Sequence, residues 1–426
     1  MQMEKYKLGD IATVEISGVD KKMKDGEKEI RLCNFVDVYY NWAITTARYD
    51  TFMFASANPN EISKFQLKKG QVALTKDSET RDDIGIPTYI ADDFDDVILG
   101  YHCALITPNK TILDGRYLNA LLHTDYAKKY FACNASGSGQ RYALSVEALN
   151  SFPVPIIPLS EQERIGEIFS ALDKKIELNR QINQNLEAMA KQLYDYWFVQ
   201  FDFPDKNGRP YKSSGGKMIW DEKLKKMIPI DWHCGNLFEI AVFTNGLACQ
   251  KFRPKDGEIP LPVIKIREMH DGISADTEEV TSNIPESVKV YNGDVLFSWS
   301  ASLEVMLWAY GLGGLNQHIF KVTSANDFPK SFYYFQLLDY VDVFKKMAEA
   351  RKTTMGHITQ DHLQQSTIAI PNNKDIADRF EELVSPIFNQ IIKLQEEIIN
   401  LTKQRDELLP LLMNGQVSVN SDLSLG

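Results

Sequence analysis

Two carboxylates in the middle of the chain have the residue types of a metal-dependent nuclease. Asp205 and Glu222 are acidic, and Lys223 follows directly. In such nucleases two carboxylates hold Mg²⁺ while a lysine positions the attacking water. The segment 206–216 between them is polar and rich in turn-forming residues, and no strand pattern presents either carboxylate. A surface linker is therefore the favoured interpretation, and a stand-alone Mg²⁺-dependent nuclease is kept as the alternative from the enzyme class.

Polar loops near the end of each half contain instead the residue types that contact DNA bases and phosphates. Residues 136–141 and 351–357 combine glycine with Ser, Thr, Gln, Arg or Lys. These side chains read base edges or grip phosphates, and glycine lets the backbone approach closely. Such loops are also common on plain surfaces, but recurrence at the equivalent place in both halves favours binding. The predicted DNA-binding residues are Lys76, Ser78, Ser136, Ser138, Gln140, Arg141, Trp299, Ser300, Arg351, Lys352, Thr353, Thr354 and His357.

Other catalytic signatures are missing from the sequence. Gly216-Lys217 is followed by Met218, which does not fit a phosphate-cradling loop. No Asn/Asp-Pro-Pro-Tyr/Phe segment offers the site of an amino-methyltransferase that extrudes a base. The five cysteines and seven histidines show no zinc-ligand spacing. We therefore predict no catalytic residue, no metal site and no cofactor on this chain.

Two long helical segments must position the polar loops. Ser160 and Glu163 form the capping box that begins the first, and in both segments the apolar residues recur every three or four positions, as in a helix packed against another helix. Asn179 and Arg405 interrupt these seams, and polar residues there fix register at some cost in stability. The predicted seam residues are Ile165, Ile168, Leu172, Ile176, Asn179, Ile182, Leu186, Met189 and Leu193, followed by Ile387, Ile391, Leu394, Ile398, Leu401, Arg405, Leu408 and Leu412.

The chain nearly repeats itself. Residues 8–12 resemble 237–241 at an offset of 229, and residues 69–74 resemble 292–297 at an offset of 223. The end of the polar loop and the β-branched stretch after it recur at an offset of about 214, and each half then enters its long helix. Four matches in the same order indicate a divergent duplication.

Each half mixes strand and helix patterns. Val72–Thr75, Val97–Ile106 and Val295–Trp299 have strand patterns, whereas Tyr117–Phe131 and Ser331–Ala350 have helical ones. The predicted fold class is α+β, with two similar globular domains joined by two long helices that form an antiparallel coiled coil with a pseudo-two-fold internal repeat. Such a rod would hold the domains about 45 to 55 Å apart, or about 13 to 16 base pairs of duplex.

The expected boundaries follow from these patterns. They are a first globular domain at 1–158, a long helix at 159–200, a linker at 201–230, a second globular domain at 231–372, a long helix at 373–414 and a tail at 415–426.

Composition limits the classes of protein that fit. The 426 residues are 44% hydrophobic and 25% charged, which suits two or three globular domains. The net charge of −11 argues against coating nucleic acid through bulk positive charge, although a local reading surface is still allowed. No run of 18 apolar residues and no apolar leader is present, so we expect a soluble, cytoplasmic protein without membrane contact.

The combination resembles the specificity subunit of type I restriction-modification systems. The segments that carry this resemblance are 155–165, 293–300, 314–320 and 405–417. It covers nearly the whole chain, in the order globular unit, helix, globular unit, helix. It implies a non-catalytic subunit whose two target-recognition units each read one half of a bipartite double-stranded DNA site. The coiled coil would set the half-site spacing and dock two modification subunits.

The resemblance also places the chemistry on other chains. S-adenosylmethionine would be bound by the modification subunits, and a separate restriction subunit would use ATP, with Mg²⁺ also expected on the partners. The loops 134–139 and 349–354 differ in sequence, so the two half-sites should differ. Self-association of the unpartnered chain is left open, and a coiled-coil scaffold that does not contact DNA is the remaining alternative.

Overall fold

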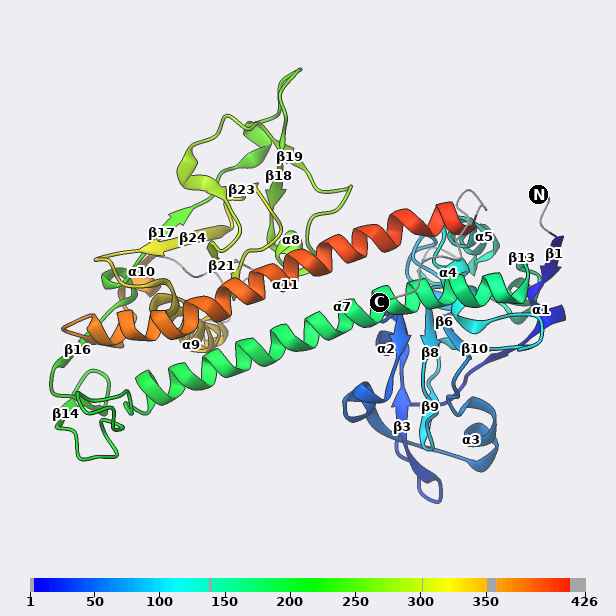
Figure 1. The fold of residues 1–426 in the computed structure, drawn as a ribbon, viewed down its shortest axis with the longest axis horizontal. Coiled ribbons are helices and arrows are strands. Elements are labelled where there is room, and N and C mark those ends of the chain that lie inside the picture. Colours follow the sequence, from blue (N-terminus) through cyan, green and yellow to red (C-terminus); the bar gives the residue numbers. More distant parts are fainter. Residues whose placement is uncertain (1–3, 138–139, 301, 351–357, 359, 414–426) are drawn as a thin grey trace. The chain divides into compact units, whose positions relative to one another are not determined.

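The structure is a computed structural model that describes residues 4–137, 140–300, 302–350, 358 and 360–413. It divides into two compact units. Unit 1 comprises Met1–Glu177 with Leu401–Gly426, and unit 2 comprises Leu178–Asn400. Each unit therefore contains a globular part and one stretch of each of the two long helices, α7 (Leu159–Tyr194) and α11 (Asp375–Met413) (Figure 1).

The globular part of unit 1 consists of short strands and mostly short helices. Its strands are β1 (Glu4–Lys7), β2 (Ala12–Ile16), β3 (Lys28–Cys33), β4 (Ala43–Ile44), β5 (Met53–Ala57), β6 (Val72–Thr75), β7 (Asp77–Ser78), β8 (Pro87–Ile90), β9 (Val97–Leu99), β10 (Cys103–Pro108), β11 (Ser136–Gly137), β12 (Tyr142–Ala143) and β13 (Pro153–Ile156). Its helices are α1 (Leu8–Ile11), α2 (Phe35–Tyr39), η1 (Thr46–Thr51), α3 (Pro59–Phe65), α4 (Gly115–Leu122), α5 (Asp125–Asn134) and α6 (Val146–Asn150).

Unit 2 likewise consists of short strands and mostly short helices. Its strands are β14 (Met218–Asp221), β15 (Lys226–Pro229), β16 (Trp232–Gly235), β17 (Ala241–Asn245), β18 (Leu261–Ile264), β19 (Glu279–Val280), β20 (Lys289–Val290), β21 (Val295–Ser298), β22 (Glu304–Leu307), β23 (Gly313–Leu315), β24 (Ile319–Ser324) and β25 (Ile368–Pro371). Its helices are the π-helical turn η2 (Asp195–Val199), η3 (Leu237–Glu239), η4 (Cys249–Lys251), α8 (Ile266–Asp271), η5 (Glu286–Val288), α9 (Lys330–Ala350) and α10 (Gln360–Gln364).

The two units share one strand order. The sheet β2-β10-β6-β8 of unit 1, with β4 added at its edge, corresponds to β17-β24-β21-β22 of unit 2, and all of the shared pairings are antiparallel. A second layer repeats as well, because β3 pairs with β9 in parallel just as β18 pairs with β23. The predicted α+β class and internal repeat are therefore confirmed.

The helical and strand patterns predicted two elements that the structure divides. The expected strand Val97–Ile106 is split into β9 and β10 by a turn at Gly100–His102, because His102 adopts a left-handed backbone with φ of 68°. The expected helix Tyr117–Phe131 is likewise split into α4 and α5. The first of these turns becomes important for the candidate site.

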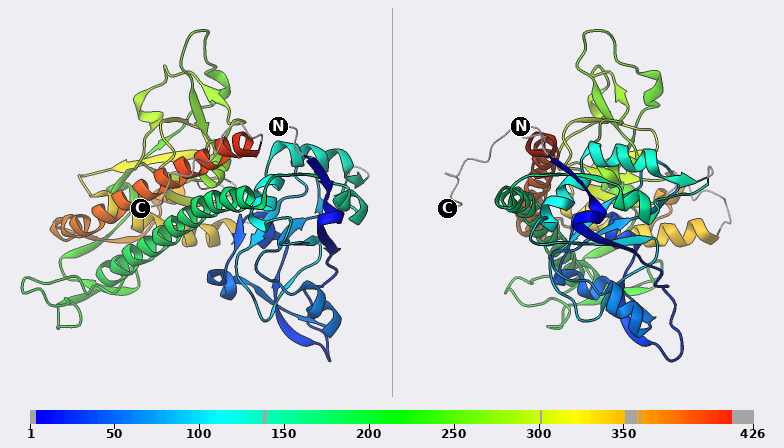
Figure 2. Two further views of the ribbon diagram at one scale, coloured as in Figure 1. Left: turned by 45° about the vertical axis from the view of Figure 1, so that its right-hand side comes forward. Right: turned by 90° about the vertical axis from the view of Figure 1, so that its right-hand side faces the viewer.

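The long helices run antiparallel where they meet. Within unit 2, Asn179 Nδ2 donates to Glu397 Oε2 at 2.9 Å, and Asn183 Nδ2 donates to the carbonyl of Ile391 at 3.4 Å. The residue number therefore rises along α7 while it falls along α11, and Figure 2 shows the two helices beside one another from two further directions. Within the core of unit 1, Leu409 of α11 shares one apolar cluster with Phe169 of α7.

No helix in the described part of the chain combines the length and the apolar character that a bilayer-spanning segment needs.

Candidate DNA-reading site

A small three-stranded sheet in unit 1 gathers predicted DNA-binding residues from distant segments. The strand order is β11-β12-β7, and Tyr142 lies opposite both Ser78 and Gly137. Lys76 lies between β6 and β7 and Ser78 ends β7, whereas Ser136 and Arg141 come from the polar loop. Cross-strand pairing thus brings together four predicted residues that are about 60 positions apart in the sequence.

The turn between β9 and β10 adds His102 to this group. The backbone N–H of Lys76 donates to the His102 carbonyl at 2.9 Å. His102 Nδ1 donates to Asp77 Oδ2, and Nη2 of Arg141 lies 3.1 Å from His102 Nε2 and 3.3 Å from Nδ1. The Arg141 guanidinium therefore rests against an imidazole that Asp77 holds in place. We call Lys76, Asp77, His102 and Arg141 the unit 1 cluster.

Asp77 is the anion that organises the unit 1 cluster. Its residue is 7% exposed, and Oδ1 accepts a hydrogen bond from Lys76 Nζ at 2.7 Å. Burial on its own raises the pKa of Asp77, but the hydrogen bonds and charges of Lys76 and His102 outweigh it and lower the pKa below its ordinary value. The carboxylate therefore stays ionised near neutral pH and holds two cationic or polar side chains at fixed positions.

Further polar groups border the unit 1 cluster. Ser136 Oγ donates to the Ala143 carbonyl at 3.3 Å, and Ser78 Oγ accepts the N–H of Thr80 at 3.2 Å. Arg81, which is exposed, lies with its guanidinium 5.0 Å from the centre of the Tyr142 ring. Gln140 is exposed, whereas Ser138 lies outside the described residues. The surface thus offers donors suited to phosphates and to base acceptors.

Trp299 of unit 2 occupies the position that Lys76 has in unit 1. The N–H of Trp299 donates to the His318 carbonyl at 3.3 Å, and its carbonyl accepts the N–H of Ile358 at 3.0 Å. In unit 1 the N–H of Lys76 donates to His102, and its carbonyl accepts the N–H of Leu144 at 2.8 Å. Both units therefore hold this position with the same two main-chain hydrogen bonds, and each places a histidine beside it.

The side chains on this shared frame differ between the units. Trp299 Nε1 donates to Asn245 Oδ1 at 3.3 Å, and its ring lies 5.7 Å from the ring of the exposed His318. Ser300 is buried, with 7% of its surface exposed, so it contributes little to the exposed surface. Unit 2 thus presents an aromatic and amide surface where unit 1 presents a cationic one.

The polar loop of unit 2 is not part of the described structure. This concerns the predicted residues Arg351, Lys352, Thr353, Thr354 and His357. Ile358, which follows them, is described; it is 1% exposed, and its N–H donates to the Trp299 carbonyl.

Most predicted seam residues lie on the buried or half-buried faces of α7 and α11. Met189, by contrast, is 49% exposed, and the neighbouring Ala190 is the buried residue of that turn. The side chain of Leu412 lies outside the described part. The buried predicted residues are Ile165, Ile176, Asn179, Ile391, Leu394 and Ile398, and the half-buried ones are Ile168, Leu172, Ile182, Leu186, Leu193, Ile387, Leu401, Arg405 and Leu408.

Arg405 anchors α11 to the globular part of unit 1. Its guanidinium carbon lies 4.7 Å from the centre of the Trp42 ring, and the ring of His123 stacks on Trp42 at 3.9 Å. Burial lowers the pKa of His123 to about 3. The hydrogen bond to the Asn119 carbonyl opposes this, and the charges of Arg405 and Lys128 add smaller contributions to the lowering. His123 is therefore neutral, and a cation can lie near it.

The carboxylates considered for a nuclease have other tasks. Asp205 Oδ1 accepts the backbone N–H groups of Asn207 and Arg209 at 2.8 and 2.9 Å, and Arg209 also pairs with it. The hydrogen bond from the Arg209 backbone, before other causes, lowers the pKa of Asp205. Glu222 is exposed in the hairpin turn between β14 and β15. Among the described residues no group of three or more His, Cys, Asp or Glu could hold a metal ion.

Sequence reasoning missed Asp77, His102 and His318. A signal for the histidines was present, because Leu99-Gly100-Tyr101-His102 and Leu315-Asn316-Gln317-His318 share leucine and histidine at the same spacing. The apolar run around His102 was assigned to one strand, which hid the turn. Asp77 carries no signal of its own, since its partners are set by the tertiary fold.

The sequence matches a family model and is similar to known proteins. The family model described as the type I restriction modification DNA specificity domain matches residues 2–188 and 229–401, which is most of the chain. The type I restriction enzyme MjaIX specificity subunit of Methanocaldococcus jannaschii is 24% identical over 312 residues, covering 71% of this chain and 69% of that protein. The HindI specificity subunit of Haemophilus influenzae is 23% identical over 411 residues, covering 83% and 88%.

A solved structure has the same fold. The crystal structure of the type I restriction-modification system S subunit from M. genitalium aligns with a TM-score of 0.57 at 13% sequence identity. The alignment covers 96% of each chain. At this identity the likeness concerns the fold.

Proposed function

The chain belongs to the type I restriction-modification DNA specificity family, and from this premise we propose how it reads DNA. It is a sequence-recognition subunit that carries no catalysis of its own. Unit 1 reads one half of a bipartite duplex site through the unit 1 cluster, and unit 2 reads the other half around Trp299 and His318. Methyl transfer and cleavage belong to the modification and restriction subunits with which it assembles.

The observation that carries this proposal is the shared frame with different side chains. Lys76 and Trp299 are held by equivalent main-chain hydrogen bonds, and each lies beside a histidine. A cationic surface suits phosphates and guanine acceptors, whereas an aromatic and amide surface suits adenine edges or thymine methyl groups. The two units therefore share one backbone arrangement and recognise two different half-sites.

The long helices have the second task. We assign to the antiparallel α7 and α11 the spacing between the half-sites and the docking of two modification subunits. Asn179 and Asn183 bond across the helix pair within unit 2, and interhelical polar contacts of this kind fix register. The chain's net charge of −11 fits such a role, because much of its surface would face protein and the partners would supply cationic contacts to DNA.

The test is the methylated motif in cells that carry the complete system. Arg141→Glu should relax or abolish recognition in one half-site and leave the other half-site unchanged, because a base-reading contact contributes about 1 to 3 kcal/mol. Single-molecule sequencing of methylated DNA reads this outcome directly.

Lys110→Glu is the matched control, since this exposed lysine lies beyond the end of β10 opposite to His102. It makes the same change of charge away from the cluster. Equal effects of the two variants, or an unaltered motif with Arg141→Glu, would refute the assignment of the unit 1 cluster. Specific binding of equal strength without the modification subunit would count against the assembly role.

A further inference from the structure

A short helix stands at the equivalent place in both units, next to the histidine turn. In unit 1, α2 follows β3, and the carbonyl of Cys33 accepts the N–H of Gly100 at 2.7 Å. In unit 2, α8 follows β18, and the carbonyl of Ile264 accepts the N–H of Asn316 at 3.0 Å. Gly100 and Asn316 each precede the histidine by two residues. Each helix therefore starts beside the candidate reading surface.

One bond that supports the start of these helices is the same in both units. The carboxylate at the third helical position accepts the N–H of the residue before the helix, from Asn34 to Asp37 at 2.8 Å and from Lys265 to Glu268 at 3.2 Å. This bond stabilises the first turn of a helix. The backbone of α2 and α8 is thus set by shared contacts, and the exposed side chains are free to differ.

We call Lys76 in unit 1 and Trp299 in unit 2 the frame position. The last turn of each helix bonds to the loop that follows this position. Tyr39 Oη donates to Asp83 at 2.9 Å in unit 1. In unit 2, His270 Nε2 lies 3.4 Å from Ser302 Oγ in this loop and 3.2 Å from Oε2 of Glu304, the first residue of β22. Both ties connect the helix to the segment between the frame position and the next strand of the sheet. The helix and the frame position therefore form one connected surface in each unit.

The exposed side chains of the two helices are unlike. Unit 1 presents Val36 of α2, which is 52% exposed, and Tyr40 directly after α2, which is 74% exposed. At the position of Val36, unit 2 presents Arg267, whose side chain is 53% exposed. The surface of this helix is thus apolar in unit 1 and charged in unit 2.

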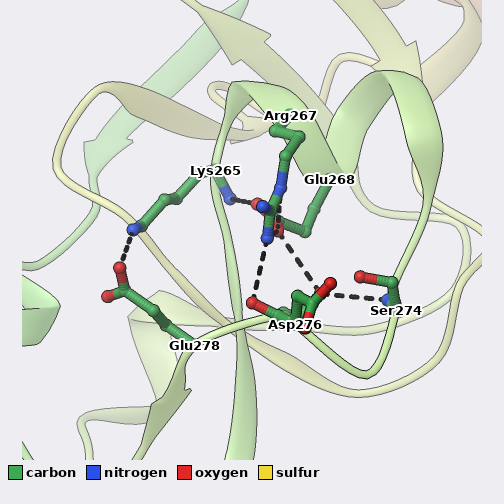
Figure 3. Close-up of polar contacts among 7 residues, drawn as sticks. Lys265, Arg267, Glu268, Ser274, Asp276 and Glu278 are labelled. Atoms are coloured by element: carbon green, nitrogen blue, oxygen red, sulfur yellow. Dashed lines mark hydrogen bonds and ion pairs between the residues drawn. The ribbon is translucent and has the colours of Figure 1, made fainter. Parts of the chain in front are cut away.

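Arg267 is held in one orientation by a buried carboxylate (Figure 3). Nε and Nη2 donate to Glu268 Oε1 at 3.0 and 2.6 Å, and Nη2 also donates to the carbonyl of Asp276 at 3.2 Å. Glu268 is 1% exposed. Nη1 makes no hydrogen bond to any residue that the structure describes. The remaining donors are therefore presented in a fixed place, which reduces the entropy lost when they bind an acceptor.

The bond that caps the start of the helix does not depend on an arginine at this position. Unit 1 forms the same cap between Asn34 and Asp37 with Val36 at the equivalent position. The arginine is therefore an addition of unit 2 to a shared scaffold. A difference of this kind, adjacent to the candidate reading surface, fits a role in distinguishing one half-site from the other.

We infer that the exposed faces of α2 and α8 are a second pair of base-reading surfaces. Arg267 donates to the acceptor edge of a guanine in the half-site of unit 2, and Tyr40 with Val36 makes apolar contact with a thymine methyl group in the half-site of unit 1. Arginine to guanine and apolar groups to thymine methyl are the pairings that major-groove geometry favours. This inference rests on the proposed function.

The experiment compares Arg267→Ala and Tyr40→Ala in the complex with the modification subunit. Each should make the methylated motif degenerate at one position, in different half-sites, and lower the affinity for the cognate duplex about 10- to 100-fold. Arg267→Lys should lose discrimination as well, because a compact ammonium does not reproduce the planar fork. Lys345→Ala, at an exposed lysine of α9, is the control and should leave the motif unaltered.

The outcomes separate the inference from the proposed function. Removal of Arg267 leaves the buried carboxylate of Glu268 without its cation. Recognition of the other half-site is therefore measured as well, because its retention shows that the chain still folds. Tyr40→Ala tests the inference without leaving a buried charge unpaired. An unaltered motif in both variants would overturn the inference. An equal loss of affinity for every DNA sequence would also overturn it, because that result indicates phosphate contact. A loss of assembly with the modification subunit would overturn it as well. If Arg141→Glu changes the motif while these variants do not, only the inference fails.

Discussion

Replacement of Asp77 by asparagine tests whether the unit 1 cluster works through positioning. Asparagine keeps the shape of the side chain but removes the charge that holds Lys76 and His102. Hydrogen bonds to a charged group contribute about 1.5 to 3 kcal/mol, and part of that is recovered by asparagine and water. We expect the affinity of the complex for its cognate duplex to fall about 10-fold, which corresponds to about 1.4 kcal/mol.

Affinity for unrelated DNA should move in the opposite direction. A negative charge about 8 Å from a phosphate opposes binding by about 0.5 kcal/mol in water. Its removal should therefore strengthen non-specific binding about two-fold. The ratio of specific to non-specific affinity should fall about 20-fold, and this opposite movement is the signature of a carboxylate that orients cations.

Fluorescence anisotropy with cognate and scrambled duplexes at 50 to 200 mM salt measures both affinities. Asp10→Asn provides the control, because this exposed carboxylate precedes β2 at the sheet end away from His102. If cognate and scrambled affinities rise together in Asp77→Asn, the carboxylate only repels DNA and the positioning argument is wrong.

Two further predictions concern stability and spacing. The pKa of His123, about 3 in the folded chain, lies below its unfolded value, so the stability that this histidine contributes is complete above about pH 6.5 and declines as pH falls toward 3; at pH 5 the loss is about 2 kcal/mol. Urea unfolding of His123→Phe should show a smaller fall between pH 7.5 and 5, and an unchanged fall would contradict this. Removal of one heptad from both α7 and α11 should shorten the half-site spacing by up to about 3 base pairs without altering the half-site sequences; sequencing of methylated DNA that shows the original spacing would contradict it.

Local periodicity made the long helices and the repeat predictable. The offset of 223 residues found in the sequence is the offset between Lys76 and Trp299, which carry the same hydrogen bonds. Likewise Leu144 and Ile358 lie 214 residues apart and make equivalent bonds. Helical and repeat signals survive in one sequence because they depend on spacing along the chain.

The connections within the site were not predictable in the same way. Asp77, His102 and Arg141 come from three separate segments, and only strand pairing brings them together. A short strand such as β7 leaves almost no periodic pattern, and pairing partners are chosen by the tertiary fold. Sequence reasoning therefore found Lys76 and Arg141 by their chemistry but not the carboxylate and imidazole between them.

The position shared by Lys76 and Trp299 shows how two readers of one origin can diverge. Main-chain groups make the bonds that hold it, so a change of side chain leaves the frame intact. The same holds at Val36 and Arg267, where a cap formed by the neighbouring carboxylate supports either residue. Where such a position is exposed and makes no ion pair, as at Val36, substitution usually changes stability by less than about 0.5 kcal/mol, whereas one base contact is worth about 1 to 3 kcal/mol. Recognition can therefore change by far more than folding does, and each half-site can evolve without the other.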